Sequence, residues 1–267
     1  MRQRYKVQLI CLDNKNEIEA FLRRNSWLYL YHIGDLDDLF WNYTTWYALK
    51  DNEQIKQLAL LYTQTSVPIL LALFDEPDNL MEELLQSLVH LLPRQFYAHL
   101  SGNVVNVLAQ KYQIQSHGVH YKMALTNTSC LQTVDTYDAV ALSESDVNDL
   151  DLLYRVSYPG NWFEPHMLKT GYYYGIWRGS DLVSAVGVHV YSQQYQVAAL
   201  GNFTTHPLFR GQGLGKAVCA KLCQALLQTV DYIGLNVRAD NISAINCYTK
   251  LGFERIATYE EFSLKLL

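Results

Sequence analysis

The 267-residue chain is predicted to have a mixed α/β fold, and three observations predict it. Strand-like and helix-like patterns alternate between residues 143 and 264. A glycine-rich segment, residues 210–215 (RGQGLG), stands between a predicted strand and a predicted helix. The first half of the chain repeats the same order of patterns more faintly. Hydrophobic residues make up 49% of the chain and charged residues 18%, so a substantial core can form.

The first elements of the C-terminal half are a helix, a short helix and three strands. Ser143 followed by Asp146 is typical of a helix start, and Leu150 and Leu153 then share one face, which predicts a helix over residues 143–154. Residues 159–161 (PGN) break it, and a short helix follows at residues 164–168. Strands are predicted at residues 172–177, 182–191 and 196–205, the first two joined by the turn RGSD.

The remaining elements complete a strand–loop–helix–strand–helix unit. Leu214, Val218, Leu222 and Ala225 recur at helical spacing and predict a helix over residues 214–227. Residues 232–237 alternate as a strand. Asp240 or Asn241 is expected to cap a further helix that Gly252 ends, and residues 253–264 supply the last strand or strands.

The N-terminal half is predicted to be a degenerate copy of the C-terminal half. Residues 46–62 read as two strands around a polar turn, as residues 173–189 do, and residues 67–74 correspond to residues 197–204. Residues 101–112 correspond to residues 239–250, which aligns Asn103 with Asn241. We therefore expect two domains, residues 1–128 and 129–267, divided at the polar turn formers around residue 128. Two α/β domains that share their patterning by chance are the alternative.

The segment after Phe74 reads DEPDNLMEELLQ, which is acidic and contains no glycine. It stands where the other half has its glycine-rich segment. Because an acidic loop repels phosphate groups, we expect any anion-binding active site in the C-terminal half alone.

Composition excludes several functional classes. The formal net charge of −5 and the pI near 5.9 offer no basic surface for nucleic acid or an anionic membrane. No apolar run is long enough for a signal peptide or a membrane span. An odd set of irregularly spaced cysteines suits reduced thiols in a cytoplasm, and no His or Cys completes a metal-ligand set near Cys219 and Cys223. We expect a cytoplasmic protein without metal, and its oligomeric state stays open.

The alternating glycines at positions 211, 213 and 215 predict an anion-binding loop. Glycines let the backbone turn tightly and leave successive N–H groups unobstructed. These groups stand at a helix N-terminus, where a partial positive charge favours an anion, and Arg210 and Lys216 add formal charge. The loop therefore predicts a phosphate or pyrophosphate site, with a ligand-free helix start as the alternative.

Two familiar phosphate motifs do not match. A Walker A loop needs glycine at position 210 and Ser or Thr after the lysine, but Arg210 and Ala217 stand there. A Rossmann fingerprint needs a third glycine at position 216, where the chain has Lys216.

The segment instead resembles the GNAT superfamily of acyl-CoA-dependent N-acyltransferases. The superfamily pattern [QR]-x-x-G-x-[GA] is matched by Arg210, Gly213 and Gly215. Its downstream helix, N-x-x-A-x-x-x-Y-x-K-x-G-F, is matched by Asn241, Ala244, Tyr248, Lys250, Gly252 and Phe253. The resemblance covers residues 133–267 well and implies a mostly antiparallel central sheet with flanking helices. A tandem chain with a decayed first copy is similar to the glycine N-acyltransferase-like branch.

The resemblance also implies a function and a set of site residues. An acetyl or other short acyl group would pass from acyl-CoA to a primary amine of a small molecule or peptide, with Tyr248 near the thioester sulfur as general acid. The pantetheine arm would pair with backbone groups of residues 203–205 and lie beside Asn241. The implied cofactor-binding residues are Phe203, Thr204, Thr205, Arg210, Gly211, Gln212, Gly213, Leu214, Gly215, Lys216, Asn241 and Tyr248. A non-catalytic acyl-CoA-binding sensor or scaffold is the alternative function.

The general base is the point at which the chain departs from many relatives. A carboxylate often stands on the strand before the loop, but residues 198–202 (AALGN) contain none. His189, His206, Glu164 or a chain of waters are the candidates. Four aromatic residues are placed either to line an acceptor cleft or to pack in the core: Tyr158, Trp162, Phe163 and Tyr172.

Overall fold

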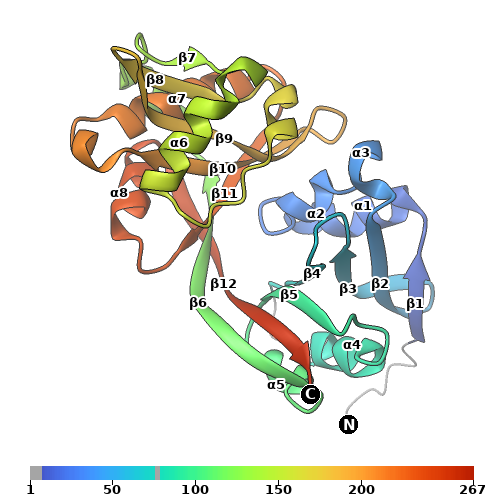
Figure 1. Cartoon of the computed structure of the whole chain (residues 1–267). Helices are drawn as coiled ribbons and strands as arrows, with labels where there is room; N and C mark the ends of the chain where they lie inside the picture. The colour runs from blue at the N-terminus through green and yellow to red at the C-terminus, as the bar shows by residue number, and fades with distance from the viewer. Residues whose placement is uncertain (1–7, 76–78) are drawn as a thin grey trace. The chain divides into compact units, whose positions relative to one another are not determined.

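The computed structural model of the chain describes residues 8–75 and 79–267, which belong to two compact units (Figure 1). The N-terminal unit comprises Met1–Lys122, Arg238–Asp240 and Ala257–Leu267, and the C-terminal unit comprises Met123–Val237 and Asn241–Ile256. Two long strands, β6 (Tyr112–Leu125) and β12 (Phe253–Leu266), contribute residues to both units. Neither unit is therefore built from one continuous stretch of sequence.

The N-terminal unit contains a mixed sheet with the strand order β1-β2-β3-β4-β5-β12-β6. From β1 to β12 the neighbouring strands are antiparallel, except that β4 and β5 pair in parallel. Its further strands are β1 (Gln8–Leu12), β2 (Thr44–Asp51), β3 (Gln54–Tyr62), β4 (Ile69–Ala72) and β5 (Gln95–Leu100). Its helices are α1 (Lys15–Leu22), α2 (Leu30–Gly34), α3 (Asp38–Trp41), α4 (Leu80–Leu88) and α5 (Val105–Leu108).

The C-terminal unit has the strand order β7-β8-β9-β10-β11-β6-β12. Here too the strands from β7 to β10 are antiparallel neighbours, and β10 and β11 pair in parallel. In Figure 1, α6 lies in front of the sheet and α7 behind it. The further strands are β7 (Val140–Ala141), β8 (Tyr174–Arg178), β9 (Asp181–Ser192), β10 (Val197–Thr205) and β11 (Tyr232–Arg238). The helices are α6 (Val147–Ser157), α7 (Leu214–Leu226) and α8 (Ile242–Lys250).

The two units share one topology, because the order and direction of the first five strands are the same in both. In each unit the next strand comes from the other half of the sequence: β12 stands beside β5, and β6 stands beside β11. The mixed, mostly antiparallel sheet with flanking helices is the fold class that the sequence predicts. The shared strand order supports the predicted duplication, whereas the domain boundary near residue 128 stays a prediction.

Local interactions explain why the helices of the C-terminal unit begin and end where they do. Ser143 and Asp146 form a reciprocal capping box, in which the Ser143 N–H donates to Asp146 Oδ2 at 2.7 Å. The helix predicted at residues 143–154 thus opens with a 3₁₀ turn (Glu144–Asp146) before α6. Asn241 Oδ1 accepts from the Ala244 N–H at 3.2 Å and starts α8. Gly252 follows α8 with φ +93°, and a Cβ there would lie 1.9 Å from the Asn127 carbonyl oxygen.

Strands β5 and β12 of the N-terminal unit present one apolar face and one polar face, as the alternation of side chains along a strand allows. Phe96, Ala98 and Phe262 pack into the apolar core with α4 and α5. His99 follows Ala98 and Glu261 precedes Phe262, and these two residues stand opposite one another on β5 and β12. The polar face of β5 and β12 therefore carries titratable side chains.

Glu261 is the centre of this polar face. Its carboxylate accepts the Tyr97 hydroxyl at 2.5 Å and the Tyr259 hydroxyl at 2.7 Å, and His99 and His120 each approach it at 3.5 Å. Burial acts to raise the pKa of Glu261, but these four neighbours lower it on balance. The carboxylate is thereby held ionised inside a folded sheet.

His32 on α2 is a second buried titratable group of this unit. Its ring is 0% exposed, packs edge-on against Tyr29, and makes no hydrogen bond of good geometry within the described residues. Burial, followed by the positive charge of Lys122, lowers the pKa of His32 from 6.5 to about 3. The ring is thus neutral across the physiological range.

We expect the stabilising contribution of neutral His32 to be lost as the pH decreases through the weakly acidic range. Between its ordinary pKa of 6.5 and its folded pKa of about 3, His32 binds a proton in the unfolded chain but not in the folded one. His32→Leu removes this difference, so the urea midpoint of the variant should rise relative to that of the wild type as the pH goes from about 8 to about 5. His90→Leu, at an exposed histidine, is the control that keeps the wild-type dependence. An unaltered pH dependence in His32→Leu would contradict this account.

Candidate functional site

The candidate site begins at the point after Leu200 and Leu235 where the parallel strands β10 and β11 cease to pair, which we call the parting. β10 and β11 form a parallel ladder of four residue pairs, from Val197 with Tyr232 to Leu200 with Leu235. Beyond this last pair, β10 continues to Thr205 and β11 continues to Arg238. The edge of β10 after Leu200 is therefore left without pairing to β11. An extended ligand can pair with such an edge as an added strand.

The same stretch of β10 carries a bulge on its β9 side. The register between the strands shifts between Gly201 and Thr204, and Asn202 has φ +51°, which is uncommon for a residue with a side chain. The Tyr154 hydroxyl donates to the Asn202 carbonyl at 2.8 Å, and Asn202 Nδ2 lies 2.9 Å from the Tyr173 hydroxyl. These hydrogen bonds hold the bulge beside the point where β10 and β11 part.

The glycine-rich loop leads directly into α7. Gly211 and Gly213 have φ +78° and +83°, and a Cβ on either would meet no described atom within 4 Å. Both glycines are thus required by backbone conformation and not by crowding. Gly213 is the N-cap, no side chain caps the helix, and the first helical bond is Ala217 N–H to the Gly213 carbonyl at 3.0 Å. The N–H groups that precede this bond form an open, partly positive helix end.

Gly215 has a different role from the two glycines before it. A Cβ at this position would lie 2.8 Å from the ring of Phe203 and 3.1 Å from Thr205 Oγ1. Only a residue without a side chain lets the first turn of α7 approach β10 this closely. The third glycine therefore places the open helix end against the unpaired edge of the strand.

Arg210 fixes the other side of the loop. Its Nε donates to the Thr205 carbonyl at 3.0 Å, while the Thr205 hydroxyl lies 2.8 Å from the hydroxyl of Ser184 on β9. The arginine side chain is exposed, and Lys216 lies on the first turn of α7. The loop thus carries two cationic residues at its ends, and one of them anchors it to the end of β10.

Helix α8 brings Tyr248 to the same part of β10. Tyr248 is 6% exposed, and its ring centre lies 5.6 Å from that of Phe203 and 5.7 Å from that of Phe253. The predicted helix motif therefore places its tyrosine next to the strand that follows the parting. Asn241 starts this helix and is exposed, with its Oδ1 engaged in the cap.

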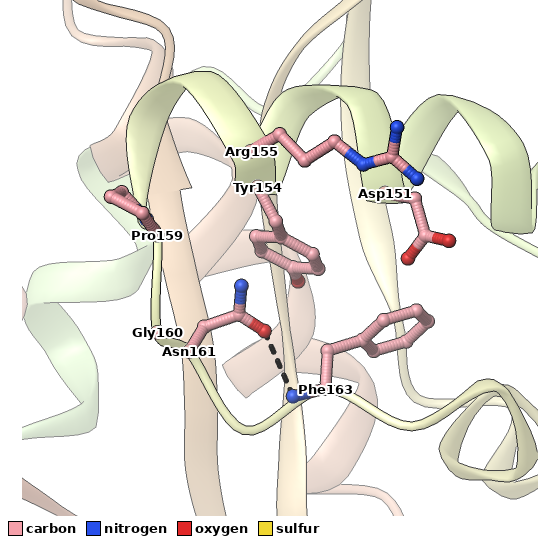
Figure 2. Close-up of a pocket in the computed structure, with 7 residues that line it drawn as sticks. All are labelled: Asp151, Tyr154, Arg155, Pro159, Gly160, Asn161 and Phe163. Atoms are coloured by element: carbon pink, nitrogen blue, oxygen red, sulfur yellow. Dashed lines mark hydrogen bonds between the residues drawn. The ribbon is translucent and has the colours of Figure 1, made fainter.

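A hollow of about 450 Å³ lies at the end of α6 (Figure 2). Asn161 Oδ1 accepts the Phe163 N–H at 2.8 Å, and the rings of Phe163 and Tyr154 have centres 5.2 Å apart. Because the hydroxyl of Tyr154 reaches the Asn202 carbonyl, this side chain links the hollow to the bulge of β10. The lining residues are Asp151, Tyr154, Arg155, Pro159, Gly160, Asn161 and Phe163.

The three base candidates from the sequence lie in different surroundings. His206 Nδ1 accepts the Leu208 N–H at 3.3 Å in the turn after β10. Glu164 pairs with His166 at 3.2 Å, and both side chains are exposed. His189 packs on the bulge itself, since a Cβ on Gly201 would lie 2.2 Å from its ring. Of these three side chains, His189 is the one in contact with β10 at the parting.

Three of the four aromatic residues predicted near an acceptor cleft divide into two groups, and the fourth, Tyr158, is the C-cap of α6. Phe163 and Trp162 lie on the bulge side, where Phe163 packs on Tyr154 and the ring of Trp162 lies 6.2 Å from that of His189. The Tyr172 hydroxyl instead lies 2.9 Å from Thr229 Oγ1, and its ring packs on Tyr191.

The corresponding strands of the N-terminal unit do not part. β4 and β5 pair from Ile69 with Tyr97 to Ala72 with Leu100, which are the last residues of both strands. Beyond the ladder, the Ser101 N–H donates to the Ala72 carbonyl at 3.2 Å and the Phe74 N–H to Ser101 Oγ at 3.3 Å. The strand edge that is open in the C-terminal unit is therefore closed here. The acidic segment predicted to replace the glycine loop falls partly on residues 76–78, outside the described residues.

Comparison with known families identifies the C-terminal half. Residues 140–253 match the family model described as the acetyltransferase (GNAT) family. These residues form a domain of the GNAT superfamily. Because this superfamily transfers acyl groups from acyl-CoA, the match supports an acyl-CoA-dependent N-acyltransferase activity in general. None of the curated proteins matches the chain.

Solved structures show that the GNAT fold extends over the whole chain. A protein from Drosophila aligns with a TM-score of 0.67 at 12% identity, over 97% of this chain and 98% of that one. A tandem GNAT protein from the clavulanic acid biosynthesis pathway aligns with a TM-score of 0.55 at 13% identity, over 98% of both chains. An acetyltransferase of the GNAT family from Novosphingobium aromaticivorans aligns with a TM-score of 0.55 at 19% identity, over 78% of this chain and 88% of that one. At these identities the likeness concerns the fold.

Residues 8–75 and 79–267 contain neither a candidate membrane-spanning helix nor a candidate metal site. No helix in these ranges has the length and apolar character needed to cross a bilayer. Nor do three or more His, Cys, Asp or Glu side chains there form a group that could hold a metal ion.

The sequence did not reveal the buried hydrogen-bonding group at the bulge. Asn202 is 3% exposed, and the side chains of Tyr154 and Tyr173 that bond to it come from α6 and from the segment before β8. The one local signal was a polar Asn within the otherwise apolar run AALGNF. The roles predicted for individual residues of the GNAT site stay proposals.

Gly215→Ala should destabilise the protein by about 1–3 kcal/mol, because its methyl group would overlap the ring of Phe203. Urea denaturation measures this loss. Adding Phe203→Leu, which removes the ring atoms in question, should restore part of the stability, and the double-mutant cycle should show the coupling. Unchanged stability in Gly215→Ala would mean that α7 does not depend on this close approach.

Proposed function

We propose that the C-terminal unit of this GNAT protein binds acyl-CoA and transfers the acyl group to a primary amine. The observation that carries the proposal is the parting of β10 and β11 beside the uncapped start of α7. A pantetheine arm has amide groups that can pair with the backbone of Phe203, Thr204 and Thr205 along the open edge. The pyrophosphate of the same molecule then meets the helix end.

The pyrophosphate is expected at the loop and first turn of α7. Backbone N–H groups of Gln212, Gly213, Gly215 and Lys216 can donate to its oxygens, and the helix end adds partial positive charge. Gly211 and Gly213 leave the approach open, because neither presents a side chain. Arg210 and Lys216 supply formal charge at the rim. Leu214 is buried and anchors the turn.

The chemistry requires one bond to form and one to break. The neutral amine nitrogen attacks the thioester carbonyl carbon, a C–N bond forms, and the C–S bond breaks to release the CoA thiolate. Tyr248 rests on Phe203, beside the strand that would carry the pantetheine arm, so its hydroxyl is proposed to give the thiolate a proton. Asn241, at the start of the same helix, would lie beside the pantetheine arm.

The acceptor is proposed to approach from the bulge side of β10. Trp162 and Phe163 provide aromatic surface there, and the hollow at the end of α6 leads to Tyr154. This supports a small-molecule or peptide amine as acceptor. One observation favours a second candidate, an acyl-CoA-binding module without turnover: β10 carries no carboxylate to serve as base.

Acetyl-CoA should raise the melting temperature of the wild type by mass action, and Gly213→Leu should abolish this shift. The leucine side chain would project over the N–H groups that hold the pyrophosphate. Gly179→Leu is the matched control, because Gly179 also has a positive φ and open surroundings but lies in the turn between β8 and β9. The control should lose stability through backbone strain and still respond to acetyl-CoA. The absence of any shift in the wild type would overturn both candidate functions.

Tyr248→Phe should keep the acetyl-CoA shift and slow turnover by about 10²–10⁴-fold, the usual contribution of a general acid. Release of free CoA thiol in a screen of primary amines provides the assay. Tyr195→Phe, in the turn before β10, is the control that should leave the rate unchanged. An unchanged rate in Tyr248→Phe would remove the tyrosine from the mechanism. Binding without turnover for every amine would favour the non-catalytic module.

A further inference from the structure

His189 is the bulged residue of β9 and lies next to the bulge of β10. In the pairing of β9 with β10, Val190 stands opposite Ala199 and Val188 opposite Leu200, so His189 is the extra residue between two consecutive pairs. Its ring lies over Gly201, where a Cβ would come within 2.2 Å of the imidazole. Gly201 is the first residue of β10 beyond the ladder with β11. The imidazole therefore contacts the strand at the point where the two strands part.

The two nitrogens of this ring differ in their surroundings. Nε2 is buried and has no hydrogen bond of good geometry within the described residues, and the same holds for Oδ1 of Asn202. The Asn202 amide nonetheless faces the imidazole closely enough to act on its charge. Buried polar atoms without a partner are rare in folded proteins, and a catalytic role is one explanation for them. Nδ1 is not a buried atom of this kind, and the His189 side chain is partly exposed, so we take Nδ1 as the nitrogen that faces the acceptor amine.

The ring is neutral at neutral pH, the form in which an imidazole accepts a proton. Burial lowers the pKa of His189, and the Asn202 amide opposes this change to a smaller extent. The groups packed around the ring are the indole of Trp162, the backbone of Gly201 and the amide of Asn202, which Tyr173 and Tyr154 hold in place. None of these is charged at neutral pH. The basicity of His189 is thus set by burial and one amide.

We infer that His189 is the general base of the acyl transfer, taking the proton from the acceptor amine at the bulge of β10. The inference rests on the proposed function. It assigns a residue to the removal of the amine proton, a step for which β10 offers no carboxylate. The amine nitrogen forms the C–N bond and passes its proton to the free imidazole nitrogen. The CoA thiolate leaves with the electrons of the C–S bond and is protonated separately.

The position of the ring suits this step. His189 touches Gly201 on the bulge side of β10, where Tyr154 of α6 also reaches the strand, whereas Tyr248 rests on Phe203 two residues later, next to the contact of Phe203 with α7. Proton removal from the nucleophile and proton delivery to the leaving group then occur on different sides of one strand. The Asn202 amide lies beside the imidazole, and the half-exposed ring of Trp162 packs against it with ring centres 6.2 Å apart.

Chemical rescue tests this assignment in the full-length protein. His189→Ala should reduce the rate of thiol release by about 100-fold or more with the best primary amine of the screen, and added imidazole should restore much of the rate by occupying the vacated space. His189→Phe fills the same space without a proton acceptor, so it should be equally slow and should not respond to imidazole. His90→Ala, at an exposed histidine of the N-terminal unit, should behave as the wild type.

The outcomes separate failure of this inference from failure of the proposed function. Both variants should retain the thermal shift with acetyl-CoA, which shows that they fold and bind the cofactor. A wild-type rate in His189→Phe would overturn the inference while leaving the acyltransferase in place. A slow His189→Ala that imidazole does not rescue would also overturn it, since the ring would then act only through packing. No thiol release with any amine in the wild type would overturn the proposed function and the inference together.

Discussion

The backbone ladder between β10 and β11 is the feature on which the site depends. Four parallel pairs hold the strands together up to Leu200 and Leu235, and both strands continue beyond them. Backbone groups of a strand need partners, so an edge opened in the middle of a sheet is a binding surface. The bulge at Asn202 and the close approach of α7 at Gly215 both occur on this open stretch. The point where the pairing of β10 with β11 ends thus lies next to both the proposed cofactor site and the proposed acceptor site.

The N-terminal unit shows what the same topology does without the interruption. Its parallel pair, β4 and β5, is complete to the last residue, and Ser101 extends the closure by hydrogen bonds to Ala72 and Phe74. Its sheet instead places Glu261, two histidines and two tyrosines on one face. The fold is therefore shared, while the opening that supports acyl-CoA binding belongs to one unit. The expectation of a single anion site in the C-terminal half stays a prediction.

Local patterns predicted the elements well, because helix periodicity, caps and glycine turns act over a few residues. Ser143 with Asp146 and Asn241 with Ala244 form the expected caps, and the glycine loop leads into a helix as predicted. Non-local features escaped prediction. The exchange of β6 and β12 between units depends on strand pairing across more than a hundred residues. The bonds of Asn202 to Tyr154 and Tyr173, and the division of roles between Gly213 and Gly215, likewise exist only after the chain has folded.

Hydrogen exchange with and without acetyl-CoA tests the central claim most directly, because it reads the backbone amides that the open strand edge and helix end leave available. The account predicts slower exchange on cofactor binding in two segments, residues 202–205 of β10 and residues 211–216 of the glycine loop and first turn of α7. The closed strands β4 and β5 should show no change. Protection confined to the N-terminal unit, or binding without protection at β10, would contradict the account.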